Sequence, residues 1–442
     1  MATGVGNPAA AIADATRFGE VRARLFFLIG ALIVYRIGSF IPVPGINPAE
    51  VARFFQENAG TILGMANMFS GGALERLSIF AMGVMPYISA SIIVQMASQV
   101  YPPWEAMKKE GEAGRRKLTQ ITRYFTLVLA VFQSLGAAVA LQNGGMVLTS
   151  GWSFLFIATV TMTTGTMFLL WLGEQVTERG IGNGISMIIL ASIVSGIPSA
   201  LGRTVESVNT GEMSGVFALV LIVVVLGVTA FCVYCERAQR RIAVHYAKRQ
   251  VGRRVMAGQT SHLPFKLNMA GVIPPIFASS LLLLPTTIVN FSAQGGDVGI
   301  GATIAAYLGH GRPLFMLLYA ALIIFFAFFY TAIVFNPVET ADNLKKQGGF
   351  IPGIRPGEKT AEFIDKVLSR ITVIGAGYLV IICLLPEILV SQAALPFYFG
   401  GTSLLIVVSV TMDTVAQVHG HLLAHQYEGL VKKSKLRGRK RS

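Results

Sequence analysis

Charged residues are scarce in this sequence. Asp, Glu, Lys and Arg make up 13% of its 442 residues, whereas about a quarter of a typical soluble domain is charged. Hydrophobic residues reach 53%, and the mean hydropathy is +0.62. A soluble globular fold cannot keep so much apolar surface away from water, so the composition excludes that class.

Cysteine is also rare. The three cysteines, Cys232, Cys235 and Cys383, all lie in apolar stretches, so no disulfide framework is expected. Cys232 and Cys235 have CxxC spacing, but a redox pair needs an exposed helix start. Inert packing is therefore the favoured interpretation.

Acidic residues are too few and too scattered for ion-coupled transport. Arg36 is the one basic residue inside an apolar stretch, and a local structural role is expected for it. The acidic residues near the ends of such stretches are Glu174, Glu236, Glu387 and Asp413. A proton-coupled carrier would be expected to hold an acidic cluster at mid-span. The sequence shows neither that cluster nor a catalytic constellation, so we expect no enzyme activity, no cofactor and no metal site.

Long apolar runs are abundant. Runs of about 20 apolar residues are typical of transmembrane helices. Ten of them occur, at 24–43, 77–100, 124–142, 153–173, 185–202, 215–236, 269–291, 314–336, 371–391 and 397–417. The sequence therefore predicts an all-α polytopic membrane protein with ten transmembrane helices.

The basic residues predict the orientation of these helices. If the N-terminus is cytoplasmic, 31 of the 36 Lys and Arg residues fall in cytoplasmic segments. Those on the opposite side are Arg53, Arg76, Arg203 and Arg312. Because cytoplasmic loops of membrane proteins are enriched in Lys and Arg, we expect both termini in the cytoplasm. The polar residues 1–22 show no signal-peptide pattern and are expected to form a cytoplasmic N-terminal segment.

Two long connections and the C-terminal tail carry most of the expected cytoplasmic charge. The connections span 237–268 and 337–370, and the basic tail spans 418–442. Membrane topology alone explains most of this excess. Docking of an anionic partner, such as ribosomal RNA or an acidic protein surface, is the second interpretation. The tail can equally contact anionic phospholipids.

Several long motifs occur in order along the chain. They are MFSGGAL (68–74), MPYISASII (85–93), GEQVTERGIGNGIS (173–186), HLPFKLNMAGVIPPIFASS (262–280), FNPVETADNLKK (335–346) and IPGIRPGEKT (351–360). Together they resemble the SecY family, the central subunit of the bacterial protein-conducting channel, and the resemblance runs from about residue 22 to 427. The resemblance implies two pseudo-symmetric halves of five helices each, residues 23–203 and 215–417, around an hourglass pore.

In this family a ring of apolar side chains forms the waist of the pore. Matching the motifs places the ring at Val84, Ile88, Ile185, Ile189, Ile276 and Ile406. Valine at position 84 departs from the usual isoleucine, so a slightly looser ring is expected. Taken singly, each of these residues is also compatible with ordinary helix packing.

The resemblance further implies a lateral gate between the second and seventh spans. Small and apolar residues mark the expected gate, namely Ser89, Ser91, Ile92, Ser279 and Ser280. Small residues permit close helix contact without large interlocking side chains, although they also occur in static interfaces.

An interrupted apolar stretch precedes the second span. A continuous helix from residue 61 to 100 would be too long for one membrane crossing. The family implies that about 62–76 folds into the outer funnel as a plug. The expected plug residues are Ile62, Met65, Phe69, Gly71 and Gly72, with the two glycines as a flexible break.

The function implied is a protein-conducting channel in the bacterial inner membrane. Arg253, Arg254 and Arg355 match the family's docking positions for the SecA motor ATPase or the ribosome. The other expected partners are SecE-like and SecG-like membrane subunits, signal peptides and nascent membrane-protein segments. Two alternatives remain from the residues alone: a secondary transporter of a small solute, and a non-conducting scaffold that docks ribosomes.

Overall fold

The computed structural model describes residues 19–57, 67, 70–211, 213–246, 249–251, 254–256, 260–282, 312–393 and 401–438. Up to residue 209 its helices are α2 (Gly19–Gly38), α3 (Pro48–Glu57), α5 (Met85–Val100), α6 (Pro102–Lys109), α7 (Glu112–Asn143), α8 (Trp152–Arg179) and α9 (Gly184–Asn209). Later helices are α10 (Gly215–Arg237), Ile273–Leu282, α13 (Pro313–Val334), α14 (Pro337–Lys346), α15 (Glu358–Ala393) and α16 (Gly401–Gly438). The strands are β1 (Gln239–Tyr246), β2 (Arg249–Val251), β3 (Arg254–Met256), β4 (Thr260–Lys266) and β5 (Gly349–Phe350).

Seven helices in the described residues are long and apolar enough to cross a membrane, which confirms a polytopic helical protein. They are α7, α8, α9, α10, α13, α15 and α16. The other three predicted spans also coincide with helices, but α2 does not meet the same criteria and α5 has only 16 residues. Within the predicted span at 269–291, the structure describes a helix at Ile273–Leu282.

The second predicted span starts later than expected. Residues 77–84 form turns rather than helix, and α5 begins at Met85. Leu77 and Gly83 have φ angles of 40° and 54°, a left-handed backbone that a right-handed helix cannot include. Pro86 then lies in the first turn of α5, where its missing N–H leaves no hydrogen bond unmade.

Helix starts in two of the motifs have simple local causes. Asn183 caps α9, since its side-chain oxygen accepts from the backbone N–H groups of Ile185 (3.1 Å) and Ser186 (3.4 Å). Asn336 caps α14 in the same way, and Pro337 follows at the first helical position. These asparagines explain why α9 and α14 begin where they do.

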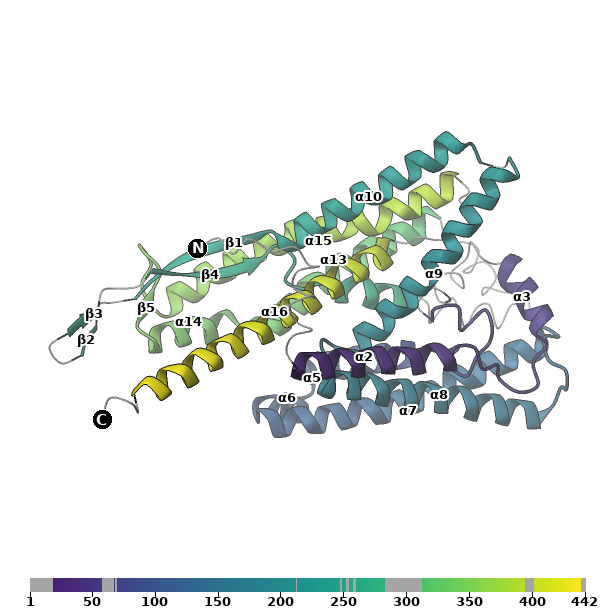
Figure 1. Cartoon of the computed structure of the whole chain (residues 1–442), viewed down its shortest axis with the longest axis horizontal. Coiled ribbons are helices and arrows are strands. Elements are labelled where there is room, and N and C mark those ends of the chain that lie inside the picture. The colour runs from purple at the N-terminus through teal and green to yellow at the C-terminus, as the bar shows by residue number, and fades with distance from the viewer. Residues whose placement is uncertain are drawn as a thin grey trace.

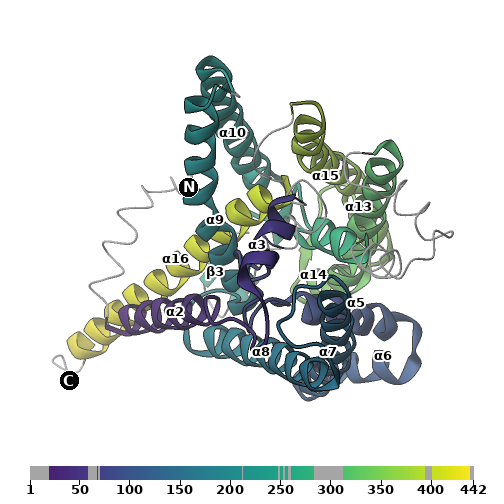
Figure 2. The same cartoon turned by 90° about the vertical axis from the view of Figure 1, so that its right-hand side faces the viewer.

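The helices form two groups in space. Figures 1 and 2 show α2, α7 and α8 on one side of the molecule and α10, α13 and α15 on the other. α7 packs against α5 and α8, whereas α13 packs against α15. α16 crosses between the groups, because it contacts α9 and α2 as well as α10 and α15.

The two long connections fold together rather than remaining loops. β1 is the central strand of an antiparallel sheet with β4 on one edge and β5 on the other. The pairs His245–Phe350 and Tyr246–Gly349 join the connection at 237–268 to the one at 337–370. Ile242 and Val244 are buried in a hydrophobic cluster beneath the sheet, which the sequence prediction of loops did not foresee.

Most of the predicted cytoplasmic segments lie at one end of the molecule. In Figure 1 the strands, α6, α14 and the C-terminal end of α16 lie to the left, while α3 lies at the opposite end. The charged connections are therefore on the same side of the helical body.

Candidate functional site

The six predicted ring residues belong to one hydrophobic cluster in the middle of the helical body. Four of them, Val84, Ile88, Ile189 and Ile406, are 1% to 7% exposed. Ile185 and Ile276 are partly buried and pack against the same cluster. Residues more than 300 positions apart in the sequence thus lie in one apolar core.

Local structure explains how four of the six predicted ring residues reach this cluster. Val84 precedes α5, and Ile88 lies one turn later, with its N–H donating to the Val84 carbonyl at 3.1 Å. Ile185 and Ile189 are also one turn apart, in the first two turns of α9 after the Asn183 cap. Residues at i and i+4 share a helix face, so each pair presents two branched side chains in the same direction.

The predicted ring residues in this cluster have aliphatic side chains, which form no hydrogen bonds and carry no charge. Val and Ile are β-branched, so their χ1 angles are restricted and their shape is well defined. A narrow passage bounded by such side chains can contact a passing chain without holding any one segment, and it resists wetting.

The predicted gate residues are mostly buried near the ring. Ser89 and Ile92 on α5 are 7% exposed, and Ser279 and Ser280 are 2% and 5% exposed. Ser91 is half-buried, and its hydroxyl accepts from the Gln95 side chain at 2.9 Å. Ile92 is in the same cluster as Phe277, Ala278 and Leu282, so α5 and Ile273–Leu282 contribute to one apolar core.

The expected plug is only partly within the described residues. Ile62, Met65 and Phe69 lie outside them. Gly71 and Gly72 are described, and their φ angles of 67° and 79° lie in the left-handed region that favours glycine. The backbone therefore turns at these two glycines, and their role as a flexible break in a plug stays a prediction.

Two of the three expected docking residues lie within the described part of the chain. Arg253 lies outside the described residues, and Arg254 begins β3. Arg355 is exposed on the turn between β5 and α15, where its carbonyl accepts from the Thr360 hydroxyl at 2.8 Å. The β2–β3 hairpin and the β5 region lie at the same end of the molecule (Figure 1).

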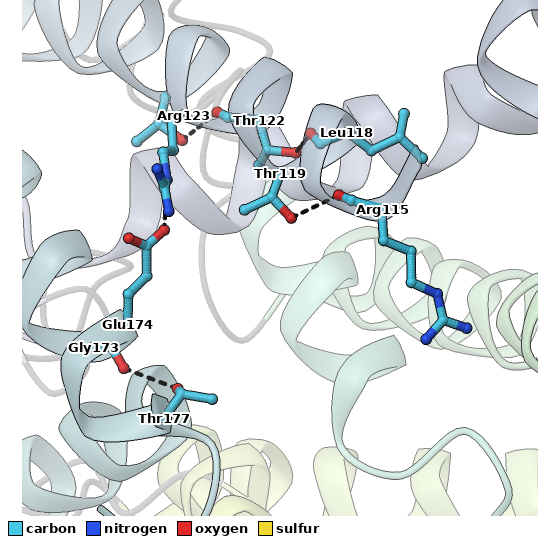
Figure 3. Close-up of polar contacts among 9 residues, drawn as sticks. Arg115, Leu118, Thr119, Thr122, Arg123, Gly173, Glu174 and Thr177 are labelled. Carbon is cyan, nitrogen blue, oxygen red and sulfur yellow. Dashed lines mark hydrogen bonds and ion pairs between the residues drawn. The ribbon is translucent and has the colours of Figure 1, made fainter. Parts of the chain in front are cut away.

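Partners for three of the acidic residues near span ends were not predicted. Figure 3 shows Glu174 on α8 facing Arg123 on α7, with an Nε–Oε1 distance of 2.7 Å. The Asn268 amide donates to Glu236 at 2.7 Å, and Lys266 lies 3.7 Å from Asp413. Each contact joins parts of the chain that are far apart in sequence. The Asn268–Glu236 hydrogen bond is buried, whereas Lys266 and Asp413 are mostly exposed, so their ion pair contributes little to stability. Nothing in the local sequence spacing could have matched partners 32 to 147 residues apart.

Comparisons with known proteins agree with this geometry. The SecY family profile matches residues 78–415. Protein translocase subunit SecY of Escherichia coli K12 is 58% identical over 424 residues, covering 95% of this chain and 96% of the relative. The same subunit of Vibrio cholerae is 57% identical, with the same coverage.

Solved structures show the same fold at low sequence identity. A protein-conducting channel superposes with a TM-score of 0.66 and 18% identity, covering 92% of this chain and 96% of that chain. Sec61 from a canine ribosome–channel complex gives a TM-score of 0.65 and 17% identity, with the same coverage. The family match, the relatives and the shared fold lead to one conclusion: this chain belongs to the SecY family.

Proposed function

We propose that this chain is the central, ten-span subunit of a channel that carries unfolded proteins across the bacterial inner membrane. The observation that carries the proposal is the convergence of six aliphatic ring residues from four separate segments into one apolar cluster. Their family context supports it, because relatives up to 58% identical are protein translocase subunits. The helices before and after the α9–α10 connection would form the two halves around the pore.

A ring of this composition suits a channel for many sequences. A polar or charged lining would bind some segments of a substrate more strongly than others and stall them. Aliphatic side chains make contact without a preferred partner, and they limit ion leakage by excluding water from a narrow neck.

The same channel would release apolar segments sideways into the lipid. A segment of about 20 apolar residues gains free energy on entering hydrocarbon, whereas a charged residue at its centre costs about 2.5–3.5 kcal/mol. The expected gate would open where α5 separates from the helix Ile273–Leu282. Each segment could then partition between pore and lipid by this difference in free energy. The gate residues are Ser89, Ser91, Ile92, Ser279 and Ser280.

Energy for transport would come from a soluble partner. SecA or a translating ribosome would dock on Arg253, Arg254 and Arg355. Of these, Arg254 and Arg355 are described, and they lie at the end of the molecule that carries the sheet. A ribosome-bound structure among the similar folds supports a ribosome as one such partner. SecE-like and SecG-like subunits would complete the membrane complex, and the basic tail would contact anionic phospholipids.

Reconstituted vesicles test this function. The purified complex, with SecA, ATP and a precursor that carries a signal peptide, should make the precursor resistant to added protease. Vesicles without ATP are the control. An unprotected precursor in the presence of active SecA would contradict the proposal.

A crosslinking experiment separates a channel from a ribosome-docking scaffold. A photoreactive probe in the middle of a stalled translocating chain should crosslink to Ile88 and Ile406. A scaffold that does not conduct would give no crosslinks at these buried positions.

A further inference from the structure

Arg36 lies in the first predicted span, and the structure shows what it binds. Its Nη1 donates to the carbonyl of Gly71 at 3.1 Å and to the Ser195 hydroxyl at 3.1 Å. The next residue toward the N-terminus, Tyr35, donates its hydroxyl to the carbonyl of Ser70 at 2.9 Å. Tyr35 and Arg36, which are adjacent near the end of α2, therefore donate hydrogen bonds to the carbonyls of two consecutive residues in the same turn.

Tyr35 and Arg36 also bind α9. The Tyr35 hydroxyl lies 2.6 Å from the Ser192 hydroxyl, and Ser195 lies about one helical turn beyond Ser192. Tyr35 is 2% exposed and Ser192 is 1% exposed. Each of the two α2 side chains thus bridges the turn at residues 70–71 to one serine of α9.

The turn itself is closed by its own hydrogen bonds. The Asn67 side-chain amide donates to Glu75 Oε2 at 3.1 Å, and its side-chain oxygen accepts from the Glu75 N–H at 2.9 Å. The Ser70 hydroxyl accepts from the Leu74 N–H at 3.0 Å. Gly72 N–H donates to the Asn67 carbonyl at 3.0 Å. These bonds make the turn a compact unit that α2 and α9 can hold as a whole.

Gly71 lies where this unit meets α9. A Cβ at Gly71 would come within 2.9 Å of Ser192 Cα and 3.0 Å of the Tyr35 hydroxyl oxygen. A Cβ at Gly72, which has a similar positive φ, would meet nothing within 4 Å. The close fit at Gly71 is therefore specific to the contact with α9.

We propose that Tyr35 and Arg36 are positioning residues that clamp the turn around Gly71 onto α9, next to the pore ring. The proposal rests on the proposed channel function. Ser192 is three residues from the ring residue Ile189, so the clamp lies about one helical turn beyond the ring on α9. Its purpose is to keep the turn fixed against α9 and the channel closed to ions at rest.

The physical reason lies in the buried carbonyl groups of the turn. The Ser70 residue is 4% exposed and Gly71 is also buried. Losing the donors from α2 leaves the Ser70 carbonyl with the longer bond from the Ala73 N–H, at 3.3 Å, and deprives the buried Gly71 carbonyl of the Arg36 donor. Such groups recruit water or force the turn to move. Either response loosens the packing next to Ile189.

Four single variants in matched pairs test the clamp. Tyr35→Phe removes one hydroxyl but keeps the ring that stacks on Phe80, and the exposed Tyr124→Phe is its control. Gly71→Ala adds a methyl group against Ser192, and Gly72→Ala is its control because it has the same backbone strain without the contact.

Hydrogen exchange of the purified complex is the first measurement. We expect amides of residues 72–75 to exchange about tenfold faster in Tyr35→Phe than in its control, as loss of one buried hydrogen bond allows. Gly71→Ala should also exchange faster than its control, because the added methyl group pushes the turn away from α9. Equal exchange in each variant and its control would overturn the clamp, and an α7 peptide reports whether the whole protein has loosened.

Resting ion conductance in planar bilayers, without precursor or motor, is the second measurement. Tyr35→Phe and Gly71→Ala should raise it severalfold over the two control variants. Conductance at the level of the controls would overturn the role in closure. Failure of the wild-type complex to protect a precursor would instead contradict the proposed channel function, so the two results are distinguishable.

Discussion

At the scale of single residues, the proposed ring would depend on the shape of its side chains and on the absence of polar atoms. Ile88 and Ile189 are buried, and each lies four residues after another predicted ring residue. A serine at either place would remove most of the aliphatic side chain and add a hydroxyl that binds water. The barrier to ions is therefore most sensitive to polarity at these positions.

Replacing Ile88 with Ser should raise the resting ion conductance of the channel severalfold in planar bilayers, because a hydroxyl at the narrow neck favours wetting. Ile93→Ser on the same helix is the matched control, since Ile93 is 42% exposed on the outer surface of the chain. Equal conductance of the two variants would refute the assignment of Ile88 to the ring.

Replacing Arg355 with Glu should abolish SecA-driven protection of a precursor while the complex still assembles. The substitution replaces an exposed positive charge with a negative one, which an acidic docking surface would repel. Arg53→Glu, at the opposite end of the molecule, should leave export at the wild-type level. Normal export by the Arg355 variant would exclude a docking role.

At the scale of elements, the two charged connections act as one folded unit. β1 pairs with β4 and β5, and the cluster beneath them includes residues of α14 and α15. Arg355 follows β5 closely in the chain, so its position depends on this unit.

Replacing Ile364 with Ala tests that dependence. Ile364 is fully buried in the cluster beneath the sheet, and truncating such a side chain costs about 2–5 kcal/mol. We expect faster proteolysis within 237–268 and reduced SecA-driven export, with unchanged resting conductance. Ile374→Ala is the control on the same helix, because Ile374 is 59% exposed. Proteolysis as slow as in this control would show that the sheet does not depend on the cluster.

At the scale of the whole molecule, the connections rich in Lys and Arg lie apart from those that contain few basic residues. The strands, α14 and the end of α16 lie at one end of the helical body, and α3 lies at the other (Figure 1). The excess of Lys and Arg at the first end predicts that it is cytoplasmic.

Cysteine labelling checks this orientation. A membrane-impermeant maleimide added to spheroplasts should label Arg53→Cys on α3, and should label Lys345→Cys on α14 only after the membrane is opened. The native Cys232, Cys235 and Cys383 are buried and give a low background. The reverse pattern would contradict cytoplasmic termini.

Much of this molecule could be predicted from local sequence. Apolar runs located the membrane-crossing helices because the lipid requirement acts on each run separately. The family motifs predicted six ring residues, and in the structure these residues lie in or pack against one hydrophobic cluster. The strands could also have been found, since Ile242 and Val244 alternate with less buried residues, which is the period of a half-buried strand.

Other features depend on which distant segments meet. The sequence marked Arg36 as an unusual charge in a span, but only the structure shows that it holds Gly71 and Ser195. Likewise, only the structure shows that β1 pairs with β5. Hydropathy and charge act along the chain, so by itself the sequence determined the membrane class, the helices and the expected orientation. Hydrogen-bond partners are set by packing between segments far apart, so only the tertiary structure decided them.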